Sequence, residues 1–200
     1  MGYTHYWQVP GKEYDQKTWD TFIKDCKTLY KRMPAVDLSN YGVGDVQPLL
    51  LNGCYAHKNA VFSKSKICFN GTYTTKRRQI TENKNKYWED ILGKDDPALG
   101  HETFIVLRKV GSVDQVIEDG DPRHFSFCKT ARKPYDLMVT ACLILYKHYF
   151  PEVRISSDGD IDEWKESFKF IAEVLPHGKE AGFELLMNES LFEEVTHVIG

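Results

Sequence analysis

Apolar positions spaced three and four residues apart predict three long helices in this chain. The first is predicted for residues 16–33, where Asp15 supplies a helix cap. The second, residues 134–150, is apolar on most faces and is expected to lie buried at the centre of the fold. The third covers residues 161–175 and begins after Asp160, which opens a sequence typical of a capping box.

Shorter β-prone stretches predict five strands between these helices. Turn residues between 102–108 and 125–128 favour a neighbouring antiparallel pair. The unit from Phe125 through the buried helix to Ser157 is expected to be a right-handed parallel crossover. The fold class that follows is α+β in two layers, with helices packed on a mixed, mostly antiparallel sheet. The predicted strands are residues 3–7, 66–70, 102–108, 125–128 and 153–157.

The 200 residues suit a single domain, residues 1–200, with loop-rich insertions at about 35–65 and 72–98. Short helices are predicted at 87–92 and 183–192. The net charge of −3 argues against nucleic acid as a partner. Five widely spaced cysteines, no leader and no membrane-length apolar run predict reduced thiols and a cytoplasmic protein without a membrane partner. No residue spacing points to a metal or a cofactor.

A basic turn ahead of the second helix is the main candidate site. Lys129, Arg132 and Lys133 precede Pro134, which is suited to a first helical turn. A helix N-terminus carries unpaired N–H groups and partial positive charge, so these cations and Thr130 could hold a phosphate or carboxylate. The alternative is a solvated loop in which the basic residues pair with a neighbouring carboxylate.

Two other segments hold candidate ligand contacts. His5, Tyr6 and Trp7 lie on the first predicted strand, where alternation puts His5 and Trp7 on one face and Tyr6 on the other. They could bond a ligand and stack on a base, or could simply be core residues. Asp158 follows the last predicted strand and could accept ribose hydroxyls or bind a metal. Its alternative role is in the turn before the third helix. Cys128 could be an activated thiol beside the basic turn or a buried one.

Several motifs resemble a widespread family of hypothetical proteins that is associated with bacterial and phage genomes. No activity is established for that family, so the resemblance transfers no catalytic residue; it implies a cytoplasmic or phage origin. The motifs are Gly2 to Trp7, Phe69-Asn70-Gly71, His101 to Phe104, the segment Phe127 to Asp136, and Ser156 to Gly159.

Two further motifs, His101-Glu102-Thr103 and His124-Phe125-Ser126, are similar to the His-x-Ser/Thr motifs of the 2H phosphoesterases. That resemblance implies phosphodiester hydrolysis, with one histidine as base and the other as acid. The motifs are only 23 residues apart, whereas that family places them in separate lobes. A simple hairpin would also put the two histidines at opposite ends.

The leading hypothesis is a protein that binds a phosphate-bearing, nucleotide-like small molecule and, if the chain is viral, sequesters a nucleotide signal of host immunity in the host cytoplasm. One alternative is a phosphodiesterase or nucleotide hydrolase that uses His5 or His101 with Glu102 or Asp158. Another is a protein-interaction module, including a homo-oligomer. Binding and catalysis are both open at this point. The ligand-binding candidates are Lys129, Thr130, Arg132, Lys133, His5, Tyr6, Trp7 and Asp158.

Overall fold

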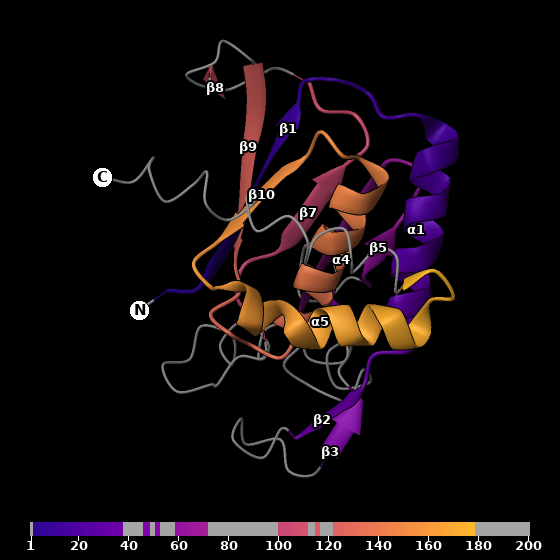
Figure 1. Ribbon diagram of the computed structural model, residues 1–200, viewed down its shortest axis with the longest axis vertical. Helices are drawn as coiled ribbons and strands as arrows, with labels where there is room; N and C mark the ends of the chain where they lie inside the picture. The colour runs from indigo at the N-terminus through magenta and orange to yellow at the C-terminus, as the bar shows by residue number, and fades with distance from the viewer. Residues whose placement is uncertain are drawn as a thin grey trace, which may run out of the picture.

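The computed structural model describes residues 2–37, 46–48, 51–52, 59–71, 100–111, 115–116 and 122–178, and these form an α+β fold (Figure 1). The helices of this part are α1 (Gln16–Lys31), α4 (Asp136–Tyr149) and α5 (Ile161–Val174). Its strands are β1 (Thr4–Pro10), β2 (Ala35–Asp37), β3 (Val46–Pro48), β4 (Leu51–Asn52), β5 (Val61–Phe62), β6 (Lys66–Gly71), β7 (Phe104–Leu107), β8 (Gln115–Val116), β9 (Pro122–Lys129) and β10 (Arg154–Ser157).

The first sheet has the order β10-β1-β9-β8, and each of its neighbouring pairs is antiparallel. On β1, His5 lies opposite Cys128 of β9 and Ser157 of β10. Side chains alternate along a strand, so His5 and Trp7 share one face and Tyr6 lies on the other. Burial agrees, because His5 and Trp7 are buried whereas Tyr6 is only partly buried.

The second sheet contains β4, β6 and β5, and β7 pairs with β6. The predicted pairing of 102–108 with 125–128 is therefore wrong, since β9 pairs with β1 and β8. Turn residues show where a chain reverses, but the burial of apolar faces decides which strands pair. Pairing with β6 buries both Phe69 and Phe104. In addition, β2 and β3 form a small separate pair.

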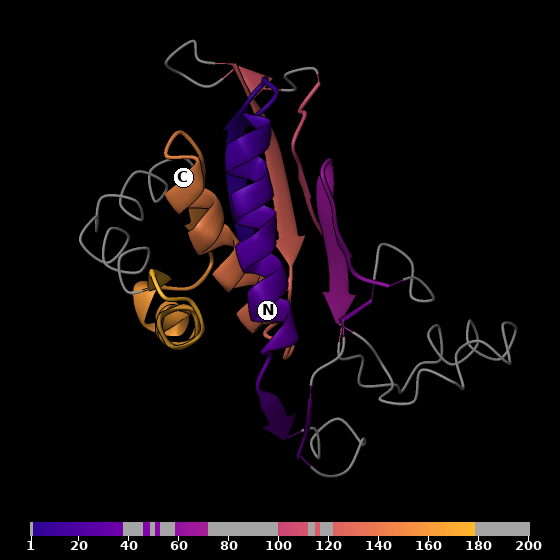
Figure 2. The same cartoon turned by 90° about the vertical axis from the view of Figure 1, so that its right-hand side faces the viewer.

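Figure 2 shows α4 and α5 on one side of β9 and the second sheet on the other. Helix α1 contacts α4, α5 and β5 of the second sheet. Helix α4 contacts both α1 and α5. Its residues from Met138 to Tyr146 are all buried, which confirms the prediction of a central helix. On α1 the apolar residues spaced three and four apart, which include Trp19, Phe22 and Cys26, are buried. Asp15 caps this helix, because its carboxylate accepts the Thr18 N–H at 2.8 Å.

The α+β class and the three predicted helices are confirmed within the described residues. The parallel crossover is not shown: β9 and β10 are each antiparallel to β1 and lie on either side of it, so they are not neighbours. The predicted helices 87–92 and 183–192, and the insertion 72–98, lie outside the described residues. Within 35–65, where a loop was expected, the described parts include β2 to β5.

The cysteines differ from the sequence expectation at one position. Cys68 is disulfide-bonded, whereas Cys26, Cys128 and Cys142 are free and buried. Wide spacing along the chain does not tell which thiols a fold brings together, so the expectation of reduced thiols fails at Cys68. None of the described helices combines the length and apolar character required to cross a membrane.

Candidate functional site

A hydrogen-bonded chain of side chains joins β10, β1 and the start of α4. The Ser157 hydroxyl lies 2.9 Å from Nδ1 of His5, and Nε2 of His5 lies 2.7 Å from Oδ1 of Asp136. The Thr130 hydroxyl donates to the same carboxylate oxygen at 2.5 Å. His5 and Thr130 are fully buried, so both have their polar groups committed to this network. We call Ser157, His5, Asp136 and Thr130 the β1 relay.

The turn beside the relay has an unusual backbone. Ala131 and Arg132 both have left-handed φ angles, 51° and 54°. The Lys133 N–H donates to the Thr130 carbonyl at 3.0 Å, which closes a tight turn around these two residues. Residues with a Cβ rarely adopt this backbone conformation, and strained residues of this kind are concentrated at functional sites. The position of the turn was predicted from the sequence, but its strain was not, because neither residue is a glycine or an asparagine.

Arg132 is held by a carboxylate and an aromatic ring. Its Nε donates to Oε1 of Glu163 at 2.9 Å, and its guanidinium lies 4.0 Å from the centre of the Tyr3 ring. The bond to Glu163 raises the pKa of Arg132. Burial raises the pKa of Tyr3 to about 12, and the nearby Asp136 carboxylate adds to this. Arg132 thus joins the turn to α5.

The protein's own carboxylate occupies the predicted anion position. Asp136 is the first residue of α4, so its charge meets the positive end of the helix dipole. It accepts hydrogen bonds from His5 and Thr130, while Arg132 is bound to Glu163. Of the predicted contacts, the relay uses His5 and Thr130. Lys133 makes contacts of its own within the structure.

Tyr6, Lys129 and Asp158 are on or beside the opposite face of the first sheet. Oδ1 of Asp158 accepts the Tyr6 hydroxyl at 3.1 Å, and its Oδ2 accepts the Thr4 N–H at 2.9 Å. Burial is the main cause of the raised pKa of Tyr6. By alternation, Lys129 shares this face with Phe127 and Phe125 on β9. We call the surface of Tyr6, Phe125, Phe127 and Lys129 the outer face.

An aromatic row runs along the outer face. The ring centres of Tyr6 and Phe125 are 5.9 Å apart, and those of Phe125 and Phe127 are 6.1 Å apart. Phe127 is 53% exposed, and across from it on β7 Ile105 and Leu107 are 40% and 41% exposed. Exposed apolar side chains that lie together often mark a binding surface, whereas single scattered ones are ordinary.

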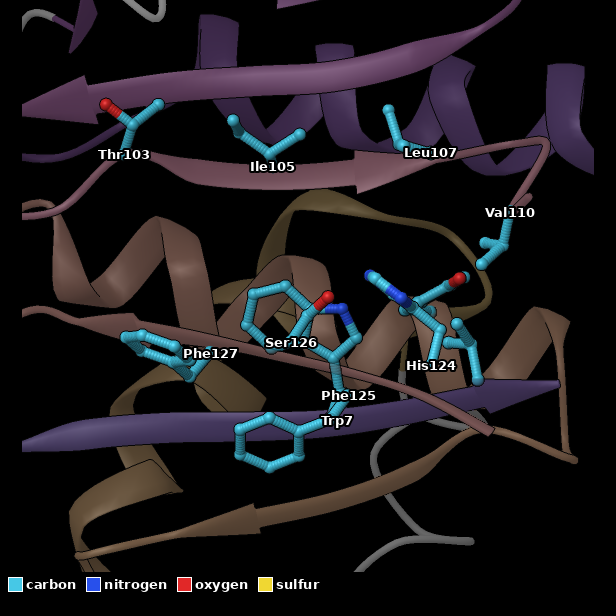
Figure 3. Close-up of a pocket in the computed structure, with 11 residues that line it drawn as sticks. Trp7, Thr103, Ile105, Leu107, Val110, His124, Phe125, Ser126 and Phe127 are labelled. Carbon is cyan, nitrogen blue, oxygen red and sulfur yellow. The ribbon is translucent and has the colours of Figure 1, made fainter. Parts of the chain in front are cut away.

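A cavity of about 300 Å³ opens between β7 and β9 (Figure 3). Thr103, Ile105 and Leu107 line it from the β7 side, and residues 124–127 line it from β9. The pairings of the described strands include no ladder between β7 and β9, so the two strand edges border the cavity. Buried Trp7 and Tyr146 also line it. We call this cavity the slit.

Backbone bonds close the slit at both ends. At one end the Glu102 N–H donates to the Lys129 carbonyl at 3.1 Å, and the Lys129 N–H donates to Oε2 of Glu102 at 2.7 Å. At the other end the Val110 N–H donates to the Lys12 carbonyl at 3.0 Å. The slit is therefore a bounded opening in the strand layer, and Lys129 stands at one end of it.

The structure separates the sequence candidates into different places. His5 and Thr130 belong to the relay, Arg132 lies beside it, and Tyr6, Lys129 and Asp158 lie on the other side of the first sheet. Trp7 is a buried core residue, 3% exposed, and it also lines the slit. Sequence reasoning missed Ser157 and Asp136 as partners of His5, as well as Phe127, Ile105 and Leu107. The register of β1 with β10 places Ser157 opposite His5, whereas Ile105 and Leu107 reach Phe127 because β7 lies beside β9 without pairing with it. Alternation along one strand supplies neither relation.

The two histidines of the second resemblance are not brought together. His101 adjoins Glu102, which bonds to Lys129, whereas His124 lies opposite Val9 at the other end of the slit. Lys129 and His124 are five positions apart on β9, roughly 16 Å at the usual rise per residue. This arrangement disfavours a shared phosphodiester site. Cys128 is buried, and burial raises the pKa of its thiol to about 12, which disfavours an activated thiolate.

Comparison with known proteins leaves the family resemblance a prediction. No family model, no curated protein and no solved structure matches this chain.

Proposed function

We propose that the protein binds a nucleotide-like small molecule at the slit, with its base between β7 and Phe127 and its phosphate at Lys129. The slit is the observation that carries this proposal. Its volume of about 300 Å³ is at the lower end of the range for small-ligand pockets. Its walls combine apolar side chains with the polar side chains of Thr103, His124 and Ser126, and two strand edges border it.

These features suit a flat heteroaromatic ring. Ile105 and Leu107 offer apolar contacts from one side, and Phe127 offers an aromatic surface from the other. A base stacked on an aromatic side chain gains about 1–3 kcal/mol. Backbone N–H and C=O groups along the strand edges can read the donors and acceptors at the edge of the base. The slit thus combines apolar and aromatic side chains with polar groups that can fix the orientation of a ligand.

Lys129 supplies a positive charge for the phosphate at one end of the slit, beside the Glu102 carboxylate that accepts its N–H. Lys129 lies two residues beyond Phe127 on the same face. Tyr6 on the neighbouring strand β1 provides a phenol, and Asp158, which follows β10, provides a carboxylate; both suit ribose hydroxyls. Arg132, which the sequence pattern favoured, is paired with Glu163 and is not needed in this arrangement.

The test is calorimetric titration of the full chain with adenosine, uridine and their monophosphates, repeated with variants. We expect Phe127→Ala to weaken nucleosides and nucleotides alike by about 5- to 150-fold, the equivalent of one lost stacked base. We expect Lys129→Ala to weaken only the monophosphates, because it removes one charge-assisted contact. Arg132→Ala and the surface control Lys165→Ala should leave affinity unchanged.

The outcomes separate the hypotheses. If Arg132→Ala abolishes binding and Phe127→Ala does not, the ligand sits at the basic turn instead of the slit. If no nucleoside or nucleotide binds and the mass in solution rises with protein concentration, the exposed apolar row is an interface of an interaction module. Mass spectrometry of the bound ligand distinguishes sequestration, which returns it unchanged, from hydrolysis. Unchanged ligand is what sequestration of a host signal requires.

A further inference from the structure

The carboxylate of Asp136 assigns the hydrogen of a neutral His5. An ionised carboxylate can only accept, so the neutral imidazole carries its hydrogen on Nε2, 2.7 Å from Oδ1 of Asp136. Nδ1 is then free to accept the Ser157 hydroxyl at 2.9 Å, while Oγ of Ser157 accepts the Gly159 N–H at 3.0 Å. A neutral imidazole with its lone pair toward a serine hydroxyl and a carboxylate on its other nitrogen is the arrangement that activates a serine.

The surroundings hold the imidazole in this position. The rings of Tyr3 and Trp164 meet it edge-on, at centroid distances of 4.9 and 5.2 Å. His5 is fully buried, and the side chain of Asp136 is 20% exposed. Charge that forms on the imidazole during proton transfer would therefore meet a carboxylate in a largely dry environment, where the attraction is strong.

Ser157 lies at the edge of this buried network. It ends β10, is only partly buried, and is followed by the tightly packed Gly159. A Cβ at Gly159 would overlap the Tyr3 hydroxyl, so that phenol lies directly against the backbone that follows the serine. Burial keeps the Tyr3 phenol protonated, and it can donate a hydrogen bond to negative charge that develops nearby. The strained residues Ala131 and Arg132 adjoin the same network.

We propose that Ser157 is the nucleophile of an acyl-transfer activity towards small activated esters, with His5 as its base and Asp136 as the residue that positions the imidazole. Oγ of Ser157 bonds to the carbonyl carbon, and its proton passes to Nδ1 of His5. The bond from carbon to the leaving oxygen breaks, and the leaving alcohol takes that proton. Water then attacks the acyl carbon and gives a proton to Nδ1 of His5. The bond from that carbon to Oγ breaks, Oγ takes the proton from His5, and the acid and the free serine are released.

The test is labelling of the full chain with a fluorophosphonate, in which Oγ–P forms, P–F breaks and fluoride leaves. Peptide mass spectrometry then maps the adduct, so the result needs no variant to fold. One adduct at Ser157 is expected. No adduct at saturating probe, or an adduct at another residue, overturns the proposal. Ser156→Ala is the matched control: it lies opposite Tyr6, on the other face of β10, and should label as the wild type does.

Two variants separate catalysis from a purely structural role. We expect His5→Gln to slow labelling by about 100-fold or more, the usual contribution of a general base. Asp136→Asn would donate to Nε2 and force the hydrogen onto Nδ1, so it should slow labelling comparably while leaving the melting temperature within a few degrees. If Asp136→Asn lowers the melting temperature but labels at the wild-type rate, the relay is structural and the proposal fails. This result is independent of nucleotide binding at the slit.

Discussion

The left-handed turn at Ala131 gives a prediction whose sign is opposite to the usual expectation. Replacing alanine by glycine normally destabilises a protein, because glycine loses more backbone freedom on folding. At Ala131, however, φ is 51°, a conformation that glycine adopts without a steric penalty and alanine does not. We therefore expect Ala131→Gly to stabilise the fold.

The size of the effect follows from two opposing terms. A left-handed residue with a Cβ costs roughly 1–2 kcal/mol. Removing the Cβ relieves this cost, but the added flexibility of glycine in the unfolded chain offsets about 0.5–1 kcal/mol of the stabilisation. The net stabilisation is about 0.5–1 kcal/mol, which for a chain of this size corresponds to a rise in melting temperature of about 1–4 °C.

Thermal or urea unfolding followed by circular dichroism measures this difference, with Ala172→Gly as the matched control. Ala172 lies inside α5, so the same substitution there should lower stability by about 1 kcal/mol. The two variants should therefore shift the midpoint in opposite directions. If Ala131→Gly destabilises as much as Ala172→Gly, the turn is not strained, and the argument from strain to function at this site fails.

Three further predictions concern the same packed regions. Gly159→Ala should lower the melting temperature well below that of Gly111→Ala, because a Cβ at Gly159 overlaps the Tyr3 hydroxyl while one at Gly111 meets nothing within 4 Å. Burial raises the pKa values of Tyr3 and Tyr14 from 10.0 to about 12, so the stability that their neutral phenols contribute is complete below pH 10.0 and is lost as the pH rises through about 12. Alkaline unfolding should fall in this window. Tyr14→Phe should reduce the fall in the free energy of unfolding by about 2 kcal/mol. Asp15→Ala should lower the melting temperature by removing the cap of α1, whereas Asp15→Asn should retain most of it.

Local rules sufficed for the helices of the described residues. Asp15 and Asp160 cap α1 and α5 as their positions in the sequence predicted, and the uniformly apolar segment became the buried α4. These features depend on residues within one or two turns of each other. Strand pairing depends on contacts distant in sequence, which is why the partner of β7 was predicted wrongly while its existence was predicted correctly.

The candidate site shows the same division between local and distant information. The sequence indicated His5, Thr130, Tyr6, Lys129 and Asp158 by residue type. It could not show that His5 bonds to Asp136, which lies 131 positions further along the chain, or that Ser157 lies opposite His5 across a strand ladder. The slit was beyond prediction for a related reason. It exists because β7 and β9 lie side by side without pairing, and the residue pattern of neither strand predicts this.

Strand β1 explains why the N-terminal motif could not serve a single site. Consecutive side chains on a strand point to opposite faces, so His5 lies in the relay while Tyr6 lies on the outer face. The two proposals can therefore be separated by neighbouring residues of one strand. Tyr6→Phe removes only the hydroxyl that reaches Asp158 and leaves the relay intact, whereas His5→Gln alters the relay and leaves the outer face intact. If Tyr6→Phe changed serine labelling, or His5→Gln changed nucleotide affinity in a folded protein, the two faces would be coupled through β1, and a two-site description would have to give way to a single extended site.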